Sequence, residues 1–249
     1  MLYYISMKKV VLITGASRGI GASMATLFAQ NGFCVAINYN KSENEANKLA
    51  NQITTCGGTA ICVKADVSNF NDCKQMVENV IKTFGHIDVL INNAGIASYN
   101  ILIDETPNNI ANIINANLVG TINCTKLVAE NMLKNDGGRI INISSIWGEI
   151  GASGESVYSA TKGAIIAFTK AMAKELAYNN ITVNCISPGI VETDMLNNLT
   201  QKEKQELLSL VPLNRLAKPE DVAELALFLA SNNSNYITGQ IISVNGGIN

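Results

Sequence analysis

The feature that most constrains how this chain can fold is a regular alternation of short apolar runs with longer helical patterns. Apolar runs of about four to eight residues are typical of buried strands, and apolar residues three or four positions apart are typical of helices. Parallel strands joined by helical crossovers form a sheet covered on both faces, so we predict an α/β fold with a doubly wound, seven-stranded parallel sheet. The predicted strands are 10–13, 34–38, 60–64, 88–92, 139–144, 181–187 and 240–245, and the predicted helices are 19–30, 42–56, 70–84, 107–133, 156–178 and 219–230.

No linker, repeat or low-complexity segment interrupts this series, so we expect a single domain over residues 1–249. With 47% apolar and 15% charged residues, the chain can build a sizeable core. Residues 1–6 are an extension before the first strand, and Met7 is an alternative start. The polar stretch at 190–215 shows no regular period.

Charge and cysteine usage argue against several classes of partner. The net charge is −2 without a basic stripe, which argues against nucleic acid as a partner. No apolar run approaches the ~18 residues that span a bilayer, so no membrane partner is expected. The six cysteines form no CxxC pair and no ligand-like spacing with the single histidine, His86, which we expect to be structural or exposed. This usage predicts a cytoplasmic protein without a structural metal.

A glycine-rich turn, T-G-A-S-R-G-I-G at 14–21, follows the first predicted strand and opens a helix. Gly15 permits a tight turn, Gly19 lets the backbone approach a pyrophosphate, and Gly21 lets helix and strand pack closely. The helix N-terminus adds unpaired N–H groups for a phosphate. An ordinary βα turn is the alternative, but the context favours a Rossmann-type dinucleotide site. We assign to the cofactor Gly15, Ser17, Arg18, Gly19, Ile20 and Gly21.

The end of the second predicted strand bears on which nicotinamide cofactor is bound. An NAD-preferring protein usually carries a carboxylate there, on the ribose 2′-hydroxyl. Here Asn38 and Tyr39 end the strand, and no carboxylate occurs before Glu43. Arg18 and Lys41 could both reach a 2′-phosphate, so we predict NADP(H) and assign Asn38, Tyr39 and Lys41 to the cofactor as well.

Two further strand ends offer cofactor contacts, each with an ordinary structural alternative. Asp66 and Val67 follow the third strand, where a short carboxylate can hold the adenine amino group; capping of the next helix is the alternative. Asn93, Ala94 and Gly95 follow the fourth strand, where small residues let the chain pass close to ribose and nicotinamide; a tight turn is the alternative.

Tyr158 and Lys162 lie four residues apart in a predicted helix, which puts both on one face. A phenol ordinarily has a pKa of about 10. A neighbouring cation lowers that pKa, and a phenol so tuned can exchange a proton with a carbonyl oxygen or an alcohol near neutral pH. A surface helix that carries Tyr and Lys by chance is the alternative for this pair alone.

Together these motifs resemble the short-chain dehydrogenase/reductase family over almost the whole chain. The resemblance rests on the glycine turn at 14–21, D-V at 66–67, N-N-A-G at 92–95, Pro188-Gly189, and Ser145, Tyr158 and Lys162 in family order and spacing.

The resemblance implies four catalytic roles. Tyr158 would be the general acid, Lys162 would lower its pKa and bind the nicotinamide ribose, and Ser145 would hold the substrate carbonyl oxygen. Asn117 would hold a water that links Lys162 to solvent, unless it is merely a polar residue of an Asn-rich helix. Of the adjacent serines 144 and 145, the spacing selects Ser145.

The resemblance also implies further contacts and an assembly. The residues that would line the nicotinamide amide and phosphate are Pro188, Gly189, Ile190 and Thr193, and 190–215 would be a mobile substrate lid. Family members are usually tetramers packed through helices such as 107–133 and 156–178. The small apolar residues of the latter helix would equally fit an intramolecular core.

Within the family, the chain is similar to bacterial 3-oxoacyl-[acyl-carrier-protein] reductases, notably in 191–195, 212–231 and 236–247. Those proteins commonly carry two carrier-facing arginines where this chain has Asp136 and Asn179, although Lys134 and Arg139 lie nearby.

The segment 143–153, with Trp147, is instead similar to the branch that reduces the 5-aminopentanone modification of elongation factor P. Both resemblances imply the reduction of a ketone to a secondary alcohol, on a small or carrier-bound substrate. A nucleotide-binding regulator without turnover is the competing hypothesis from another class, and the complete set of Ser145, Tyr158 and Lys162 favours an enzyme.

Overall fold

A computed structural model of the chain describes residues 8–193 and 200–248. Seven parallel strands form one sheet in the order β3-β2-β1-β4-β5-β6-β7. The strand order reverses between β1 and β4, which is the point where doubly wound sheets bind ligands beyond the carboxyl ends of their strands. The predicted fold class is confirmed. The strands are β1 (Val10–Ile13), β2 (Cys34–Tyr39), β3 (Thr59–Lys64), β4 (Val89–Asn92), β5 (Gly138–Ile143), β6 (Ile181–Pro188) and β7 (Ile241–Val244).

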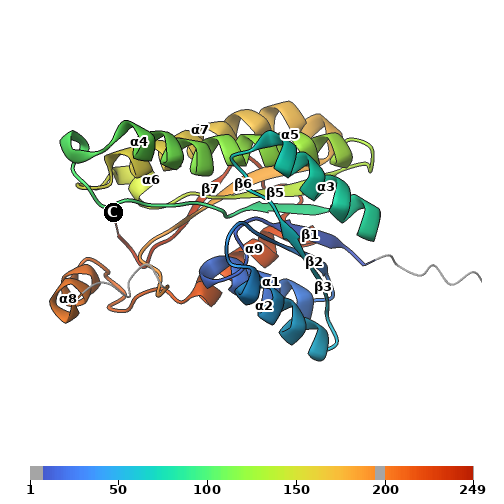
Figure 1. The fold of residues 1–249 in the computed structure, drawn as a ribbon, viewed down its shortest axis with the longest axis horizontal. Coiled ribbons are helices and arrows are strands. Elements are labelled where there is room, and N and C mark those ends of the chain that lie inside the picture. The colour runs from blue at the N-terminus through green and yellow to red at the C-terminus, as the bar shows by residue number, and fades with distance from the viewer. Residues whose placement is uncertain (1–7, 194–199, 249) are drawn as a thin grey trace, which may run out of the picture.

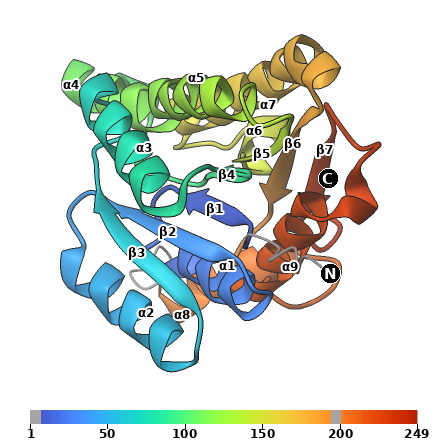
Figure 2. The ribbon, with the colours of Figure 1, turned by 90° about the vertical axis from the view of Figure 1, so that its right-hand side faces the viewer.

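Helices cover both faces of the sheet, as Figures 1 and 2 show. One layer holds α3, α4, α5 and α7, and the opposite layer holds α1, α2 and α9. Alternate side chains of the strands enter two separate cores because successive residues of a strand face opposite sides. The longer helices are α1 (Gly19–Gln30), α2 (Glu43–Thr55), α3 (Phe70–Phe84), α4 (Pro107–Ile114), α5 (Gly120–Met132), α7 (Ser156–Leu176), α8 (Gln201–Ser209) and α9 (Pro219–Ala230).

The structure differs from the expected elements in three places. The helix predicted at 107–133 is divided into α4 and α5 by a π-helical segment, η2 (Asn115–Val119). A short helix that the sequence analysis missed, α6 (Trp147–Ile150), lies between β5 and α7. The irregular stretch at 190–215 contains α8, which begins with a capping box between Thr200 and Glu203. Part of this stretch, 194–199, and the extension with Met7 lie outside the described residues.

Close packing at Gly120 accompanies the π-helical segment. A Cβ atom on Gly120 would lie 2.6 Å from Cγ2 of Val67, so only glycine lets α5 approach the chain after β3 this closely. An extra residue in one helical turn changes which side chains face inward. Asn117, within η2, is fully buried, whereas its neighbours Asn115 and Leu118 are not.

Within residues 8–193 and 200–248, no helix has the length and apolar character needed to cross a membrane, and no group of three metal-ligating side chains occurs. His86 lies before β4, where its Nε2 atom is 2.9 Å from Asp88 Oδ2.

Candidate active site

The glycine turn and the N-N-A-G segment form one structure at the carboxyl edge of β1 and β4. The Thr14 hydroxyl accepts hydrogen bonds from the backbone N–H groups of Asn93 (2.9 Å) and Ala94 (3.0 Å). Asn93 Nδ2 donates in return to the carbonyl oxygens of Thr14 (2.9 Å) and Gly15 (3.0 Å). Asn93 therefore supports the glycine turn, which is a structural role beside the cofactor contact predicted for it.

The glycine positions behave as their predicted backbone roles require. Gly15 and Gly19 have positive φ angles of 60° and 57°, which other residues rarely adopt. A Cβ on Gly15 would lie 2.8 Å from Ala94 Cα, and one on Gly21 would lie 2.6 Å from the Gly15 carbonyl oxygen. These contacts leave no room for a side chain at either position.

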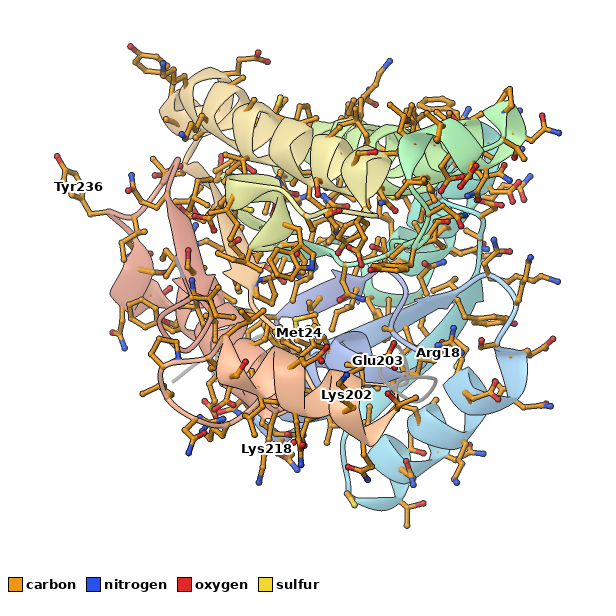
Figure 3. All side chains as sticks on the ribbon, turned by 90° about the vertical axis from the view of Figure 1, so that its left-hand side faces the viewer. Arg18, Met24, Lys202, Glu203, Lys218 and Tyr236 are labelled. Atoms are coloured by element: carbon orange, nitrogen blue, oxygen red, sulfur yellow. The ribbon has the colours of Figure 1, made fainter. Side chains whose placement is uncertain are left out.

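The N-terminus of α1 is suited to bind a phosphate. Arg18, its N-cap residue, makes no capping hydrogen bond, and the first turn contains no acidic residue. The first N–H groups of the helix therefore remain available to an anion, which the helix dipole favours. Among the described residues, a Cβ on Gly19 would meet only the side chain of Thr193, at 3.5 Å, so the chain after β6 borders this turn. Figure 3 shows the Arg18 side chain at the surface of the molecule.

Asn38 has a structural role that the sequence did not reveal. Its side chain is buried; Oδ1 accepts from the Gly15 N–H (3.1 Å), and Nδ2 donates to the carbonyl oxygens of Val63 (3.2 Å) and Ala65 (3.1 Å). These bonds use the whole amide to join the glycine turn to β3. The exposed cations near this strand end are instead Arg18 and Lys41.

Asp66 forms a local turn rather than the cap of α3. Its Oδ1 accepts from the N–H (2.9 Å) and the hydroxyl (2.6 Å) of Ser68, and Asn69 caps the helix by accepting from the next turn. Burial raises the pKa of Asp66, but hydrogen bonds from Ser68 and Asn40 and the charge of Lys41 together leave the pKa below its ordinary value. The carboxylate is therefore ionised at neutral pH and can accept from an amino group.

The Ser145, Tyr158 and Lys162 side chains come together between β5 and α7. Ser145 follows β5, and its hydroxyl accepts from the Trp147 N–H at 3.2 Å. Lys162 is buried; its ammonium donates to the Ile143 carbonyl oxygen at 2.8 Å and lies 5.6 Å from the centre of the Tyr158 ring. The predicted one-turn spacing on α7 thus puts the cation beside the phenol.

Burial shifts the pKa values of both Tyr158 and Lys162. It raises the pKa of Tyr158 to about 12; a hydrogen bond with Ser145 opposes this rise, and the charge of Glu155 adds to it. Burial also lowers the pKa of Lys162 to about 8. Desolvation of the phenol accounts for the direction of its shift, and the expectation that Lys162 lowers the phenol's pKa stays a prediction. At neutral pH the phenol keeps its proton, as a general acid must.

Asn117 is held at the same point by the chain after β4. Its Oδ1 accepts from the Ile96 N–H (2.8 Å), and its Nδ2 donates to the Ile96 carbonyl oxygen (3.0 Å) and the Thr161 hydroxyl (3.0 Å). A Cβ on Gly95 would lie 3.1 Å from Asn117 Oδ1 and 3.6 Å from Lys162 Nζ. Asn117 therefore fastens the segment beside Lys162, and it is no incidental polar residue of an Asn-rich helix.

The comparisons with known proteins agree with this geometry. A family model described as "Enoyl-(Acyl carrier protein) reductase" matches residues 15–249. A 3-oxoacyl-[acyl-carrier-protein] reductase of Staphylococcus epidermidis is 41% identical over 242 residues, which cover 97% of this chain and 99% of that protein. The chain belongs to the short-chain dehydrogenase/reductase family. Two further 3-oxoacyl-[acyl-carrier-protein] reductases, from Synechocystis and Thermotoga maritima, are 42% and 41% identical over 96% of this chain, covering 96% and 97% of those proteins.

This dehydrogenase/reductase supports its site with residues that the sequence analysis did not single out. The Thr161 hydroxyl donates to the Tyr158 carbonyl oxygen (2.7 Å) and accepts from Asn117, so it links two of the predicted site residues. The Ser144 hydroxyl donates to the Lys162 carbonyl oxygen (2.8 Å), which leaves Ser145 as the serine facing the site. Nothing in the local sequence distinguishes Thr161, because its role depends on η2.

The remaining predicted residues of this dehydrogenase/reductase lie where β6 ends. The Pro188 carbonyl oxygen accepts from the Ile146 N–H (2.9 Å), and the Gly189 N–H donates to the Val244 carbonyl oxygen (2.9 Å). Ile190 is buried in a small cluster with Ile146, against which Trp147 packs. The end of β6 therefore closes the site behind Ser145.

Proposed function

We propose that this protein reduces a ketone to a secondary alcohol with NADPH, and that a 3-oxoacyl thioester is its substrate. The observation that carries the proposal is the group of buried Ser145, buried Lys162 and half-buried Tyr158 beside a glycine turn suited to a phosphate. The three relatives are named for a 3-oxoacyl substrate, whereas the family model is described as an enoyl reductase. The Ser145 hydroxyl acts on the Tyr158 hydroxyl, and this pair favours the ketone, whose oxygen can accept from both as it becomes an alkoxide.

The proposed roles follow from positions and charges. NADPH, when bound, supplies the hydride. The Ser145 hydroxyl holds the carbonyl oxygen, and Tyr158 gives its proton to that oxygen as negative charge develops. Lys162 is cationic below its pKa of about 8 and stabilises the phenolate that remains. Asn117 positions the segment beside Lys162 and holds a water toward solvent.

The cofactor assignment rests on residues that fit a dinucleotide. The glycine turn leaves the N–H groups of α1 free for the pyrophosphate, and Asp66 is an ionised acceptor for the adenine amino group. Arg18 and Lys41 are exposed cations for the 2′-phosphate. We further propose contacts from Ser17, Ile20, Tyr39, Val67, Ala94, Gly95, Pro188, Gly189, Ile190 and Thr193.

We also propose that the chain forms a single domain and that residues 190–215 form a lid over the site. The protein would be cytoplasmic and would assemble as a homotetramer. Ile114, Ile122 and Leu133 are exposed on the layer of α4 and α5, which supports assembly through these helices.

A second candidate substrate follows from the surface where acyl carrier protein would dock, because that surface lacks two expected arginines. Asp136 and Asn179 stand at the two positions of the expected arginines. Arg139 is not free to replace them, because its guanidinium donates to the Gly138 carbonyl oxygen and to Asn235. The weak basic character of this surface favours the 5-aminopentanone modification of elongation factor P as the alternative substrate.

The decisive experiment is a side-by-side assay of NADPH oxidation with an acetoacetyl thioester and with modified elongation factor P. Turnover of the thioester supports the first substrate, and turnover of the modified factor alone supports the second. Cofactor binding without turnover on either substrate or on a panel of ketones would identify a regulator instead.

A further inference from the structure

One hydroxyl group, that of Thr161, joins the helix of the proton donor to the segment proposed to contact the cofactor. Tyr158 and Thr161 lie near the start of α7. Ala94 and Gly95, for which we propose cofactor contacts, follow β4. These two parts of the site are distant in sequence, so their relative position depends on contacts between side chains.

The connection is a chain of hydrogen bonds that runs from Ile96 through Asn117 and Thr161 to Tyr158. The Asn117 amide binds both the N–H (2.8 Å) and the carbonyl oxygen (3.0 Å) of Ile96, and it also donates to the Thr161 hydroxyl (3.0 Å). That hydroxyl donates its own hydrogen to the Tyr158 carbonyl oxygen at 2.7 Å. An amide nitrogen has two hydrogens and a hydroxyl has one, so every donor in the chain is used.

Burial makes this chain of hydrogen bonds sensitive to the loss of any member. Thr161 and Asn117 are 3% and 0% exposed, and a fully satisfied network in such surroundings is rigid. Without the Thr161 hydroxyl, one buried hydrogen of the Asn117 amide would have no acceptor. To find another acceptor the amide has to turn, and it then releases the Ile96 backbone. The segment after β4 would thereby be free to shift relative to Tyr158.

A second threonine of α7 has the same pattern of hydrogen bonds, but its partners lie outside the candidate site. Thr169 is fully buried; its hydroxyl donates to the Ile165 carbonyl oxygen (2.8 Å) and accepts from Asn142 Nδ2 (2.9 Å). Loss of either hydroxyl leaves one buried amide hydrogen unpaired. Only at Thr161 does that amide hold a segment of the site, so the two positions separate a structural role from a catalytic one.

We propose, on the basis of the ketone reduction proposed above, that Thr161 is a positioning residue, which fixes the proton donor relative to the cofactor. Both hydrogen bonds of its hydroxyl go to the protein, so it acts through Asn117 and through the Tyr158 backbone. The transfer of hydride and proton needs both donors in place at once, whereas binding of the ketone does not. Loss of the hydroxyl therefore lowers kcat and leaves KM nearly unchanged.

The test compares Thr161→Val with Thr169→Val, since valine keeps the shape of threonine and lacks the hydroxyl. The substrate is the one that the parent protein turns over with NADPH, acetoacetyl thioester or modified elongation factor P. The melting temperatures of both variants should fall by similar amounts, because each leaves one buried donor unpaired. We expect kcat to fall about tenfold or more in Thr161→Val, with KM within about twofold of the parent value.

Thr169→Val should keep kcat within about twofold of the parent value, and Thr161→Ser, which retains a hydroxyl, should recover most of the activity. Equal kcat in the two valine variants, a loss that lies in KM, or no recovery in Thr161→Ser would overturn the inference while leaving ketone reduction intact. If Thr161→Val does not fold, Thr161→Ala and Thr169→Ala are compared by the same criteria, since alanine is the best helix former. Failure of the parent protein to turn over either substrate or a panel of ketones would overturn the proposed function itself.

Discussion

Lys162 is a buried ammonium whose only described hydrogen-bond acceptor is the Ile143 carbonyl oxygen. Its pKa of about 8 lies below the ordinary value of 10.5, which means that burial penalises the charged form. The folded state therefore binds this proton more weakly than the unfolded chain does. The penalty is fully present below pH 8 and disappears as the pH rises toward 10.5.

Replacement of Lys162 by Met should therefore abolish reduction and stabilise the fold. Removal of the buried charge gains more than the hydrogen bond to Ile143 loses, so we expect about 1–2 kcal/mol at pH 7. The gain should shrink between pH 8 and pH 10.5. Urea denaturation of both proteins at pH 7 and pH 10 measures it, and a gain that grows with pH would contradict a burial penalty on the charged ammonium.

Tyr158→Phe removes the proton donor and keeps the ring. We expect a loss of about 10²–10⁴-fold in kcat/KM, because general acid catalysis is lost. The dissociation constant for NADPH, measured by fluorescence titration, should stay within a factor of about two, since Phe retains the packing. A comparable loss of cofactor binding would mean that the phenol is needed for the nucleotide rather than for the proton.

NADPH should be preferred over NADH by at least about tenfold in kcat/KM, or roughly 1.4 kcal/mol. The double change Arg18→Ala and Lys41→Ala should remove most of this preference, because both exposed cations lie near the predicted 2′-phosphate. The double change Lys48→Ala and Lys82→Ala, an equal loss of charge at exposed positions of α2 and α3, is the matched control. Equal use of both cofactors by the parent protein would contradict our interpretation of the residues at the end of β2.

Residue types and spacing were sufficient to predict the glycine turn and to put Lys162 beside Tyr158, because both depend on local geometry, whereas Ser145 was assigned through the family resemblance. The pKa of Tyr158 was not predictable, because it depends on how deeply the phenol is buried. The structural role of the Asn38 amide was not predictable either, because its partners Val63 and Ala65 are distant in sequence.

At the scale of elements, the contact between α6 and α7 positions the catalytic residues. Gly148→Ala would bring a Cβ within 2.7 Å of the Lys162 carbonyl carbon and 2.9 Å of the Gly163 nitrogen, both backbone atoms that cannot turn aside. We expect a loss of about 1–3 kcal/mol in stability. Activity should fall by about tenfold or more, since small displacements at a catalytic centre are costly.

Gly163→Ala is the matched control across the same contact. Its nearest neighbour would be the Gly148 carbonyl oxygen at 3.2 Å, and alanine favours the helix interior by about 1 kcal/mol. Melting temperatures and kcat/KM of the two variants should therefore differ clearly. Equal effects would show that the approach of α6 to α7 does not limit the site.

The strands were predicted to within about two residues because each apolar run is bounded by polar or glycine residues. The π-helical segment η2 was not predicted, because α4 and α5 show a helical period on either side of it. Directly after η2, Gly120 packs closely against Val67. This contact joins residues that are distant in sequence, so no local pattern reveals it.

For the whole molecule, we expect light scattering to give the mass of four 26.6-kDa chains. Ile122→Glu on the exposed face of α5 should reduce that mass, because an unpaired charge in an apolar interface is unfavourable. Thr54→Glu on α2, in the opposite layer, is the control (Figure 1). A monomer in both the parent protein and the control would contradict the proposed assembly.

The bonds between Thr14 and Asn93 join residues that are 79 positions apart. A nascent chain therefore has no completed phosphate loop until the fourth strand has left the ribosome and paired with the first. Cofactor binding then becomes a late event in biosynthesis, and a ligand that binds only the assembled loop stabilises complete chains over truncated ones. We therefore expect the supply of NADPH to affect how much newly made protein survives, in addition to how fast the finished protein works.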